Sequence, residues 1–272
     1  MDNRQAIEND SAAQIPEYEY KGLMAQAWDV FRGDTSTWED RLFYLKIIQQ
    51  YGQPVLDVGC GTGRLLLDYL AQGLDVDGVD ISPEMLALCR HKAGALGLAP
   101  ALYEQPIETL ALPRQYRTIL IPSSTLQLVT EPARVVQALR QVYAHLLPGG
   151  VVAASVMALW KTGDPLEGEW EITAVRSEDG ATFRRVIRNR YEPAIECEHT
   201  EDLYQMIVGG QVVAEELHRR SPATRSYTQA QARAVFESAG FSLIELYSKF
   251  TFELAQPDDT LFTVVAHKAN HP

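Results

Sequence analysis

Three glycines at two-residue spacing follow a short apolar run in PVLDVGCGTGR, residues 54–64. Glycine loses more backbone entropy on ordering than any other residue, so this turn indicates a backbone that a ligand approaches closely. Asp57 stands two residues before the first glycine, and Asp80 ends the next apolar stretch, 17 residues after Gly63. A carboxylate at the end of that stretch can accept hydrogen bonds from both hydroxyls of a ribose. The pattern therefore predicts a site for an adenosine-like nucleoside.

The spacing of the glycines separates two classes of cofactor. Dinucleotide sites use G-x-G-x-x-G, which leaves the start of the helix free to hold a pyrophosphate. Here the pattern is G-x-G-x-G, and the carboxylate of Asp57 would repel a pyrophosphate. The same carboxylate is compatible with a cofactor that carries an amino group and a sulfonium. The loop therefore favours S-adenosylmethionine, and a nicotinamide oxidoreductase is the least favoured function.

The elements around this loop alternate between strands and helices. Such alternation predicts an α/β fold, with a Rossmann-like, seven-stranded, mostly parallel sheet and helices on both faces. Residues 168–221 break the rhythm, because β-forming residues there are separated by turn residues, which predicts an inserted antiparallel β-sheet. The expected parts are an N-terminal helical cap at 1–50, a cofactor-binding core at 51–160 and 228–272, and an inserted β lid at 161–227.

Four stretches resemble the motifs of class I S-adenosylmethionine-dependent methyltransferases. VLDVGCGTGR is similar to their first motif, GVDISPEML to their second and LLPGGVV to the turn before their fifth strand, while FTFELAQPDDTLFTVVAHKA resembles their final antiparallel hairpin. The resemblance covers roughly residues 38–160 and 228–268. It implies methyl transfer from S-adenosylmethionine to a nitrogen or oxygen nucleophile of a small molecule, with S-adenosylhomocysteine as the product.

The resemblance also implies roles for individual residues. Asp57 is expected near the methionine amino group of the cofactor and Asp80 at the ribose hydroxyls, with Ile81 and Met85 against the adenine. The family often has Asp followed by an apolar residue after the third strand, where this chain has Gln105-Pro106-Ile107, so the adenine amino group needs another partner. The expected cofactor-binding set is Asp57, Gly59, Cys60, Gly61, Gly63, Asp80, Ile81, Met85, Gln105 and Ile107.

The methyl acceptor is expected over the end of the fourth strand, at IPSST, residues 121–125. The Asp/Asn-Pro-Pro-aromatic tetrapeptide of methyltransferases that act on amide or adenine nitrogens is absent, which disfavours DNA and glutamine as acceptors. Aromatic residues of the cap and lid can clamp a ring or a cationic amine. The expected substrate-binding set is Trp28, Ser123, Ser124, Gln127, Trp160, Arg225 and Tyr227. No catalytic residue is assigned, and His199 and Tyr227 are the candidates.

The composition limits the partners. A net charge of −12 argues against a nucleic-acid partner. The three cysteines match no metal-binding spacing, so no metal is expected, and they favour a reduced, cytoplasmic compartment. No apolar run is long enough to span a membrane. The chain is expected to be a monomer or a homodimer. Two alternatives remain open: an enzyme that uses the cofactor without methylation, and a catalytically silent, cofactor-binding regulator.

Overall fold

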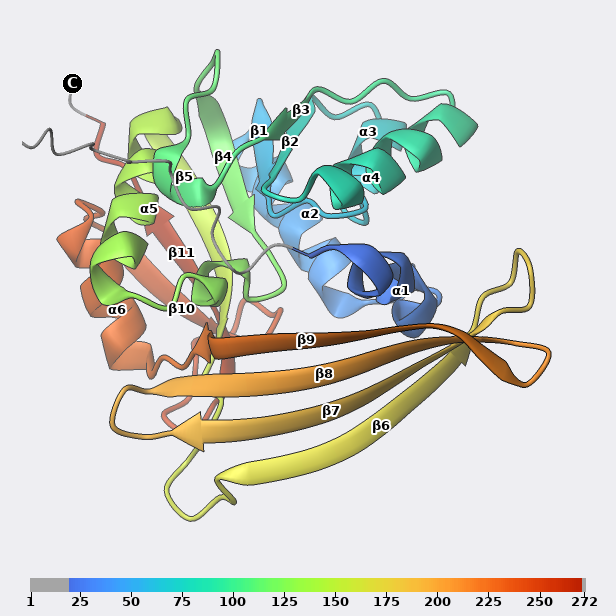
Figure 1. Cartoon of the computed structure of the whole chain (residues 1–272). Helices are drawn as coiled ribbons and strands as arrows, with labels where there is room; N and C mark the ends of the chain where they lie inside the picture. Colours follow the sequence, from blue (N-terminus) through green and yellow to red (C-terminus); the bar gives the residue numbers. More distant parts are fainter. Residues whose placement is uncertain (1–19, 271–272) are drawn as a thin grey trace, which may run out of the picture.

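The computed structural model describes residues 20–270, which form two β-sheets and the helices around them (Figure 1). The larger sheet has seven strands in the order β10-β11-β5-β4-β1-β2-β3. Its strands are β1 Val55–Val58, β2 Val76–Asp80, β3 Leu102–Glu104, β4 Tyr116–Ile121, β5 Leu146–Met157, β10 Ile244–Ser248 and β11 Leu261–His267. Strands β3, β2, β1, β4 and β5 pair in parallel, while β11 is antiparallel to both β5 and β10. The predicted mostly parallel sheet is confirmed.

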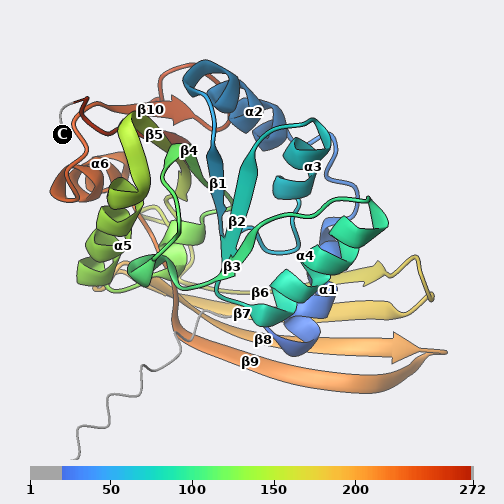
Figure 2. The same ribbon diagram turned by 90° about the horizontal axis from the view of Figure 1, so that it is seen from above.

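Helices cover both faces of this sheet (Figure 2). The helices of the described chain are α1 Gly22–Arg32, α2 Glu39–Tyr51, α3 Leu66–Ala71, α4 Pro83–Ala95, α5 Pro132–His145 and α6 Gln229–Ser238, with short 3-10 turns η1 Ile107–Thr109 and η2 Thr125–Leu128. Alternate residues of a strand point to opposite faces. Val55 of β1 accordingly packs with α2, α3 and α4, whereas Leu56 packs with α5 and α6. None of these helices is long and apolar enough to cross a membrane.

The second sheet is the predicted antiparallel insertion, and its four strands follow one another in space as they do along the chain. They are β6 Glu167–Val175, β7 Thr182–Glu192, β8 Cys197–Val208 and β9 Gln211–Arg225. Figure 1 shows this sheet, yellow to orange, below the core with α1 lying on it. Leu23, Met24 and Ala27 of α1 pack against Phe183 and Tyr204 of the sheet. Helix α1 therefore belongs to the core of the insertion as much as to the N-terminal cap, whose residues 1–19 lie outside the described part.

Candidate functional site

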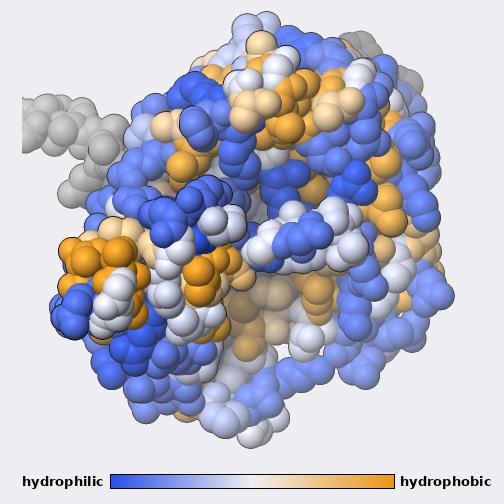
Figure 3. Space-filling model, turned by 90° about the vertical axis from the view of Figure 1, so that its right-hand side faces the viewer, coloured by the Kyte–Doolittle hydropathy of each residue, from blue (hydrophilic) through white to orange (hydrophobic). Residues whose placement is uncertain are grey.

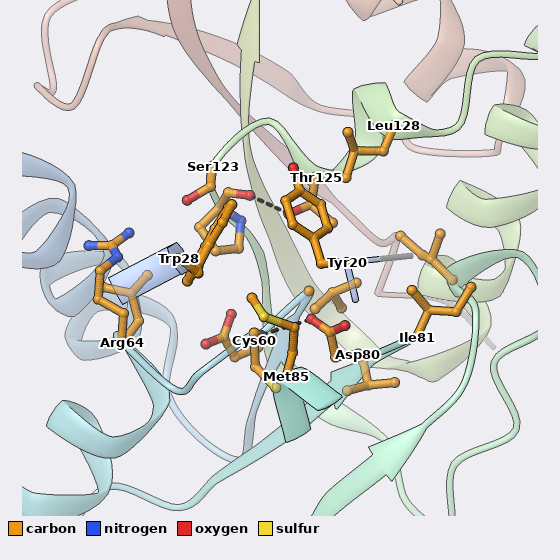
Figure 4. A pocket seen from close by; sticks show the side chains of 18 of the residues that line it. Tyr20, Trp28, Cys60, Arg64, Asp80, Ile81, Met85, Ser123, Thr125 and Leu128 are labelled. Carbon is orange, nitrogen blue, oxygen red and sulfur yellow. Dashed lines mark hydrogen bonds between the residues drawn. The ribbon is translucent and has the colours of Figure 1, made fainter. Parts of the chain in front are cut away.

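A pocket opens where β1, β2 and β4 end, beside α1 (Figure 4). Its volume, part of which is open to solvent, is about 910 Å³, which is within the range of ligand-binding pockets. The loop after β1, the residues after β2, the turn after β4 and one side of α1 all contribute to its lining. This is the edge of the sheet where ligands of doubly wound folds bind.

The glycine loop forms the floor of this pocket with Gly59 and Gly61. Both have left-handed backbones, with φ of 70° and 55°. A Cβ on Gly59 would lie 2.5 Å from the Thr125 methyl carbon, so that position needs glycine. Gly63 has a different role and does not line the pocket. A Cβ there would lie 2.6 Å from Cys89 Sγ and 2.8 Å from Leu67 Cγ, so Gly63 lets α3 and α4 pack together.

Asp80 is held in the pocket by two backbone donors. Its Oδ2 accepts a hydrogen bond from the Gly61 N–H (2.8 Å), and its Oδ1 accepts one from the Ser82 N–H (2.9 Å). Ser82 also caps α4 by accepting from the Met85 N–H at 3.1 Å. A carboxylate oxygen has lone pairs for more than one donor, so Asp80 can still accept from hydroxyls of a ligand.

Asp57 is a buried carboxylate at the other side of the loop, only 1% exposed. Its Oδ1 accepts no hydrogen bond from the described residues. Burial raises the pKa of Asp57 to about 7, although the nearby Arg64 guanidinium acts in the opposite direction. Arg64 itself is paired with Asp40, at 3.0 Å between Nη1 and Oδ1. A cation bound in the pocket would favour the ionised form of Asp57, which suits the amino group of S-adenosylmethionine.

The residues expected around an adenine are all found at the pocket. Ile81, Met85, Gln105 and Ile107 all line it. The Gln105 side chain is occupied, because its Oε1 accepts from the Ala111 N–H (2.8 Å) and its Nε2 donates to the Ala111 carbonyl (3.3 Å). Gln105 thus fixes the loop before β4, while its stem contributes to the pocket wall.

The expected acceptor side is only partly assembled at the pocket. Trp28 and Ser123 line it, and Trp28 packs edge-to-face on Tyr20 with 4.7 Å between the ring centroids. Ser123 and Ser124 both have left-handed backbones, with φ of 54° and 57°, which turns the chain sharply after β4. Ser124 is absent from the lining, and its N–H donates to Ser155 Oγ at 3.1 Å. Only the first serine of this turn faces the pocket.

Gln127, Trp160 and Arg225 do not line the pocket and instead join the insertion to the core. Gln127 is fully buried, and its amide donates to the carbonyls of Met157 and Arg225 and accepts from the Met157 N–H. The Arg225 guanidinium donates to the Thr130 carbonyl at 2.7 Å. The Trp160 ring stacks on another aromatic ring, that of Tyr191 in β7, at 5.4 Å. Their role in binding the acceptor stays a prediction.

Neither candidate catalytic residue lines the pocket. His199 lies on β8 of the insertion, where its Nδ1 contacts Ser221 Oγ at 2.7 Å. Tyr227 is buried, its hydroxyl has no hydrogen-bond partner among the described residues, and burial raises its pKa to about 12. A phenol of such high pKa stays protonated at neutral pH, so Tyr227 offers almost no phenolate to act as a general base. The lining supplied by residues 20–270 contains no histidine.

Several residues of the lining lie outside the binding sets expected from the sequence. Tyr20, Arg32, Arg64, Thr125, Leu128 and Val129 are among them, although Thr125 belongs to the stretch 121–125 where the acceptor was expected. Two of them carried a usable signal: Arg32 follows Trp28 by one helical turn, and Thr125 follows the two predicted serines. Arg32 lies over the Trp28 ring, with 3.2 Å from its Cζ to the ring centroid. Burial lowers the pKa of Arg32 to about 10, which leaves it a cation at neutral pH.

The three cysteines are free and buried, and no group of metal-ligating side chains occurs within residues 20–270. Burial raises the pKa of the Cys60 thiol far above its usual value, so this pocket residue carries no thiolate at neutral pH. Cys60 therefore contributes its backbone and its apolar bulk to the loop.

Comparison with known proteins gives one matching domain family. Residues 55–150 match the family described as a methyltransferase domain. A putative methyltransferase of a Geobacillus species is 26% identical over 83% of this chain and 90% of its own length. A dTDP-3-amino-3,6-dideoxy-alpha-D-glucopyranose N,N-dimethyltransferase of Streptomyces fradiae is 25% identical over 86% of this chain and 90% of its own length.

The fold is similarly shared with solved structures. An S-adenosylmethionine-dependent methyltransferase from Clostridium acetobutylicum superposes with a TM-score of 0.72 at 18% identity, over 90% of this chain and 96% of that one. The superposition extends well beyond the matched domain and includes most of the described insertion.

Proposed function

We propose that this chain is a class I S-adenosylmethionine-dependent methyltransferase that transfers a methyl group to the amino nitrogen of a small molecule, as its methyltransferase-domain match at residues 55–150 and its fold support. The observation that carries the proposal is the pair of carboxylates at one pocket. Asp57 is buried and has an oxygen without a partner, and Asp80 is held toward the pocket by two backbone N–H groups. A cofactor with an ammonium at one end and a ribose in the middle suits both.

The residues of this chain bind and orient the two reactants. When bound, S-adenosylmethionine supplies the electrophilic methyl group. Asp57 would hold the ammonium and Asp80 the ribose, while Met85 and Ile107 would cover the face of the adenine ring. Trp28 and Ser123 border the opposite side of the pocket, where the acceptor nitrogen must approach in line with the bond that breaks. The catalysis proposed is alignment and exclusion of water.

Nitrogen is favoured over oxygen as the nucleophile. An amine with a free pKa near the working pH can lose its proton to solvent before it binds, whereas a hydroxyl usually needs a general base. The described lining offers no histidine for that purpose, and Asp57 and Asp80 have other roles. The similarity to an amino-sugar N,N-dimethyltransferase over 86% of this chain supports an amine acceptor as well. A cytoplasmic location and a monomeric or dimeric state are part of the proposal and remain predictions.

Calorimetry and a turnover screen test this function. S-adenosylhomocysteine is expected to bind the wild type in the micromolar range, and Asp80→Ala to weaken binding about tenfold or more, since charge-assisted hydrogen bonds to the ribose are lost. A panel of small amines with S-adenosylmethionine should release S-adenosylhomocysteine and give a product heavier by one methyl group. Tighter binding of a nicotinamide dinucleotide would contradict the proposed cofactor. Cofactor binding without turnover on any amine or alcohol would favour the silent regulator.

A further inference from the structure

A row of polar atoms without partners crosses the inner face of the β6–β9 sheet. Asn189 of β7, Thr200 of β8 and Arg220 of β9 occupy directly paired positions on neighbouring strands. Asn189 Oδ1, Thr200 Oγ1 and both Nε and Nη1 of Arg220 are buried and make no hydrogen bond with the described chain. Buried polar atoms are normally satisfied, because leaving them unpaired costs free energy. These three residues, the polar row, therefore require an explanation.

The strand beside the row makes room for it. Gly168 of β6 pairs with Asn189, and a Cβ at that position would lie 2.7 Å from Asn189 Oδ1. The Asn189 amide nitrogen is already used, since it donates to Glu198 Oε1 at 2.6 Å. The remaining amide oxygen needs a donor, such as a hydroxyl or an N–H of a ligand.

The polar row carries a positive charge that no described carboxylate neutralises by a hydrogen bond. Arg220 lies 5.4 Å from the centroid of the Tyr20 ring, and its two buried nitrogens have no acceptor among residues 20–270. The neighbouring Arg185 differs, because it is paired with Asp202 at 2.9 Å. Asp202 keeps one unpartnered oxygen, Oδ2, but no hydrogen bond joins it to Arg220. Nε and Nη1 lie on different edges of the guanidinium, and each edge is completed by Nη2. Each edge thus presents a fork of two parallel N–H donors that matches two oxygens of a carboxylate or phosphate.

Tyr20 connects the polar row with the cofactor pocket. Its ring lines the pocket and contacts both the Arg220 guanidinium and the edge of Trp28. Figure 4 shows Tyr20 and Trp28 on the side of Ser123 and Thr125, across the pocket from Met85 and Asp80. Arg32 adds a second guanidinium here, and Asp29 of the same helix is already paired with Lys92 at 2.9 Å. Figure 3 shows a hollow on the face of the molecule that lies on the right in Figure 1.

We propose that the polar row binds an oxyanion carried by the methyl acceptor, a phosphate or a carboxylate, while the acceptor's amino group reaches the pocket beside Ser123. This inference rests on the proposed function and narrows its substrate to anionic small molecules. Arg220 supplies the two parallel N–H donors of one guanidinium edge, and Thr200 supplies a hydroxyl donor, to the oxyanion. Asn189 accepts from a hydroxyl next to it. Tyr20 packs on the part of the acceptor between the two ends.

Anion titrations of the protein saturated with S-adenosylhomocysteine test this site. Inorganic pyrophosphate and malonate serve as probes, and calorimetry at low salt gives their dissociation constants. Arg220→Gln is expected to weaken probe binding about tenfold or more, and Arg220→Lys less, since lysine keeps the charge without the fork. The matched control is Arg219→Gln on the opposite face, where the side chain is 69% exposed and paired with Glu201. It should change probe affinity less than twofold.

The two proposals fail in different ways. Equal probe affinity in wild type and Arg220→Gln, or no probe bound by the wild type, would overturn the polar row as a site while S-adenosylhomocysteine still binds. Failure of the wild type to bind S-adenosylhomocysteine counts against the methyltransferase proposal instead. Tighter binding of pyrophosphate than of malonate identifies the oxyanion as phosphate, and the reverse identifies it as carboxylate. If Arg220→Gln does not fold, the same comparison is made with Arg220→Lys and Thr200→Val.

Discussion

At the scale of single residues, the charge state of Asp57 that favours ligand binding is the one that lowers the stability of the folded chain. Burial raises its pKa from the ordinary 3.8 to about 7. The folded chain thus holds this proton more tightly than the unfolded chain, so ionisation of Asp57 costs stability as the pH rises from about 4 to about 7, and the full cost is present above 7. The ionised form is nevertheless the one that binds an ammonium. Such a conflict between stability and binding is typical of functional carboxylates.

Asp57→Asn should separate the two effects. We expect the cofactor-free variant to gain about 1–3 kcal/mol in free energy of unfolding at pH 8 and much less at pH 5, because the buried charge is removed. S-adenosylhomocysteine should bind the variant tenfold or more weakly, with little dependence on pH between 6 and 7.5. Urea unfolding at both pH values and calorimetry measure these quantities.

Asp68→Asn is the control for a carboxylate on the outside of the same region. Asp68 is paired with Arg41, and its side chain is 25% exposed. Its substitution should neither stabilise the chain at pH 8 nor change the affinity for S-adenosylhomocysteine. Loss of stability in Asp57→Asn at pH 8 would show that the hydrogen bonds of the carboxylate outweigh the cost of its burial.

Residues near the glycine loop could be predicted from the sequence, and those near the insertion could not. Asp57, Gly59 and Asp80 line the pocket because two consecutive strand–turn–helix units put them there. The position of Gln127 depends instead on partners 30 and 98 residues away in the chain. No local pattern reports which carbonyls lie beside an amide in the folded chain. The prediction for Gln127 was made from its distance to β4. It therefore did not include the hydrogen bonds by which Gln127 connects the insertion to the core.

At the scale of elements, the glycine loop is built for packing as well as binding. Gly63 and Gly73 both have left-handed backbones, with φ of 86° and 81°. A Cβ on Gly73 meets no atom within 4 Å, whereas one on Gly63 meets Cys89 and Leu67 below 3 Å. The two positions therefore share the backbone strain of a substitution and differ only in the space around it.

Alanine at these two positions should measure the packing of α3 against α4. Gly73→Ala is expected to cost about 1 kcal/mol in free energy of unfolding, from backbone strain alone. Gly63→Ala is expected to cost about 1–3 kcal/mol more, because α3 and α4 must move apart. Denaturant unfolding of the two variants gives the difference. Equal losses would mean that the contact with Cys89 relaxes freely, and the assigned packing role of Gly63 would then be wrong.

The order of the elements was predictable, but their ends were not. Alternation of strands and helices indicated the parallel sheet, and turn residues indicated the insertion; both are confirmed. The stretch LLPGGVV, residues 146–152, was expected to form the turn before the fifth strand, yet β5 begins at Leu146, because Leu146 pairs with Tyr116 before a shift in register. Strand β9 likewise runs to Arg225, which pairs with Cys197. Strand ends depend on pairing across the sheet, which hydrophobic periodicity along one segment does not report.

At the scale of the whole molecule, α1 joins the two sheets. Its apolar residues pack on Phe183 and Tyr204 of the β6–β9 sheet, while Trp28 and Arg32 line the cofactor pocket. Removal of the insertion would therefore expose the apolar face of α1 and disturb the pocket as well. Residues 161–227 were expected to form a lid separate from the cofactor-binding core. The shared helix predicts instead that the insertion and the pocket are energetically coupled.

Phe183→Ala tests this coupling without removing any part of the pocket lining. Phe183 is fully buried and lies on the insertion. We expect a loss of about 3–5 kcal/mol in free energy of unfolding, as for other buried phenylalanines. We also expect weaker binding of S-adenosylhomocysteine, because α1 no longer holds Trp28 in place. Denaturant unfolding and calorimetry measure the two effects.

Phe236→Ala is the matched control. Phe236 is 1% exposed and lies in α6, in the core that α5 and α6 form with the large sheet. It should lose a similar amount of stability, but wherever the variant is folded its affinity for S-adenosylhomocysteine should match that of the wild type. Equal effects of both substitutions on affinity would mean that binding follows overall stability. An effect of Phe183→Ala alone would mean that the inserted sheet, through α1, helps to position the residues that bind the cofactor.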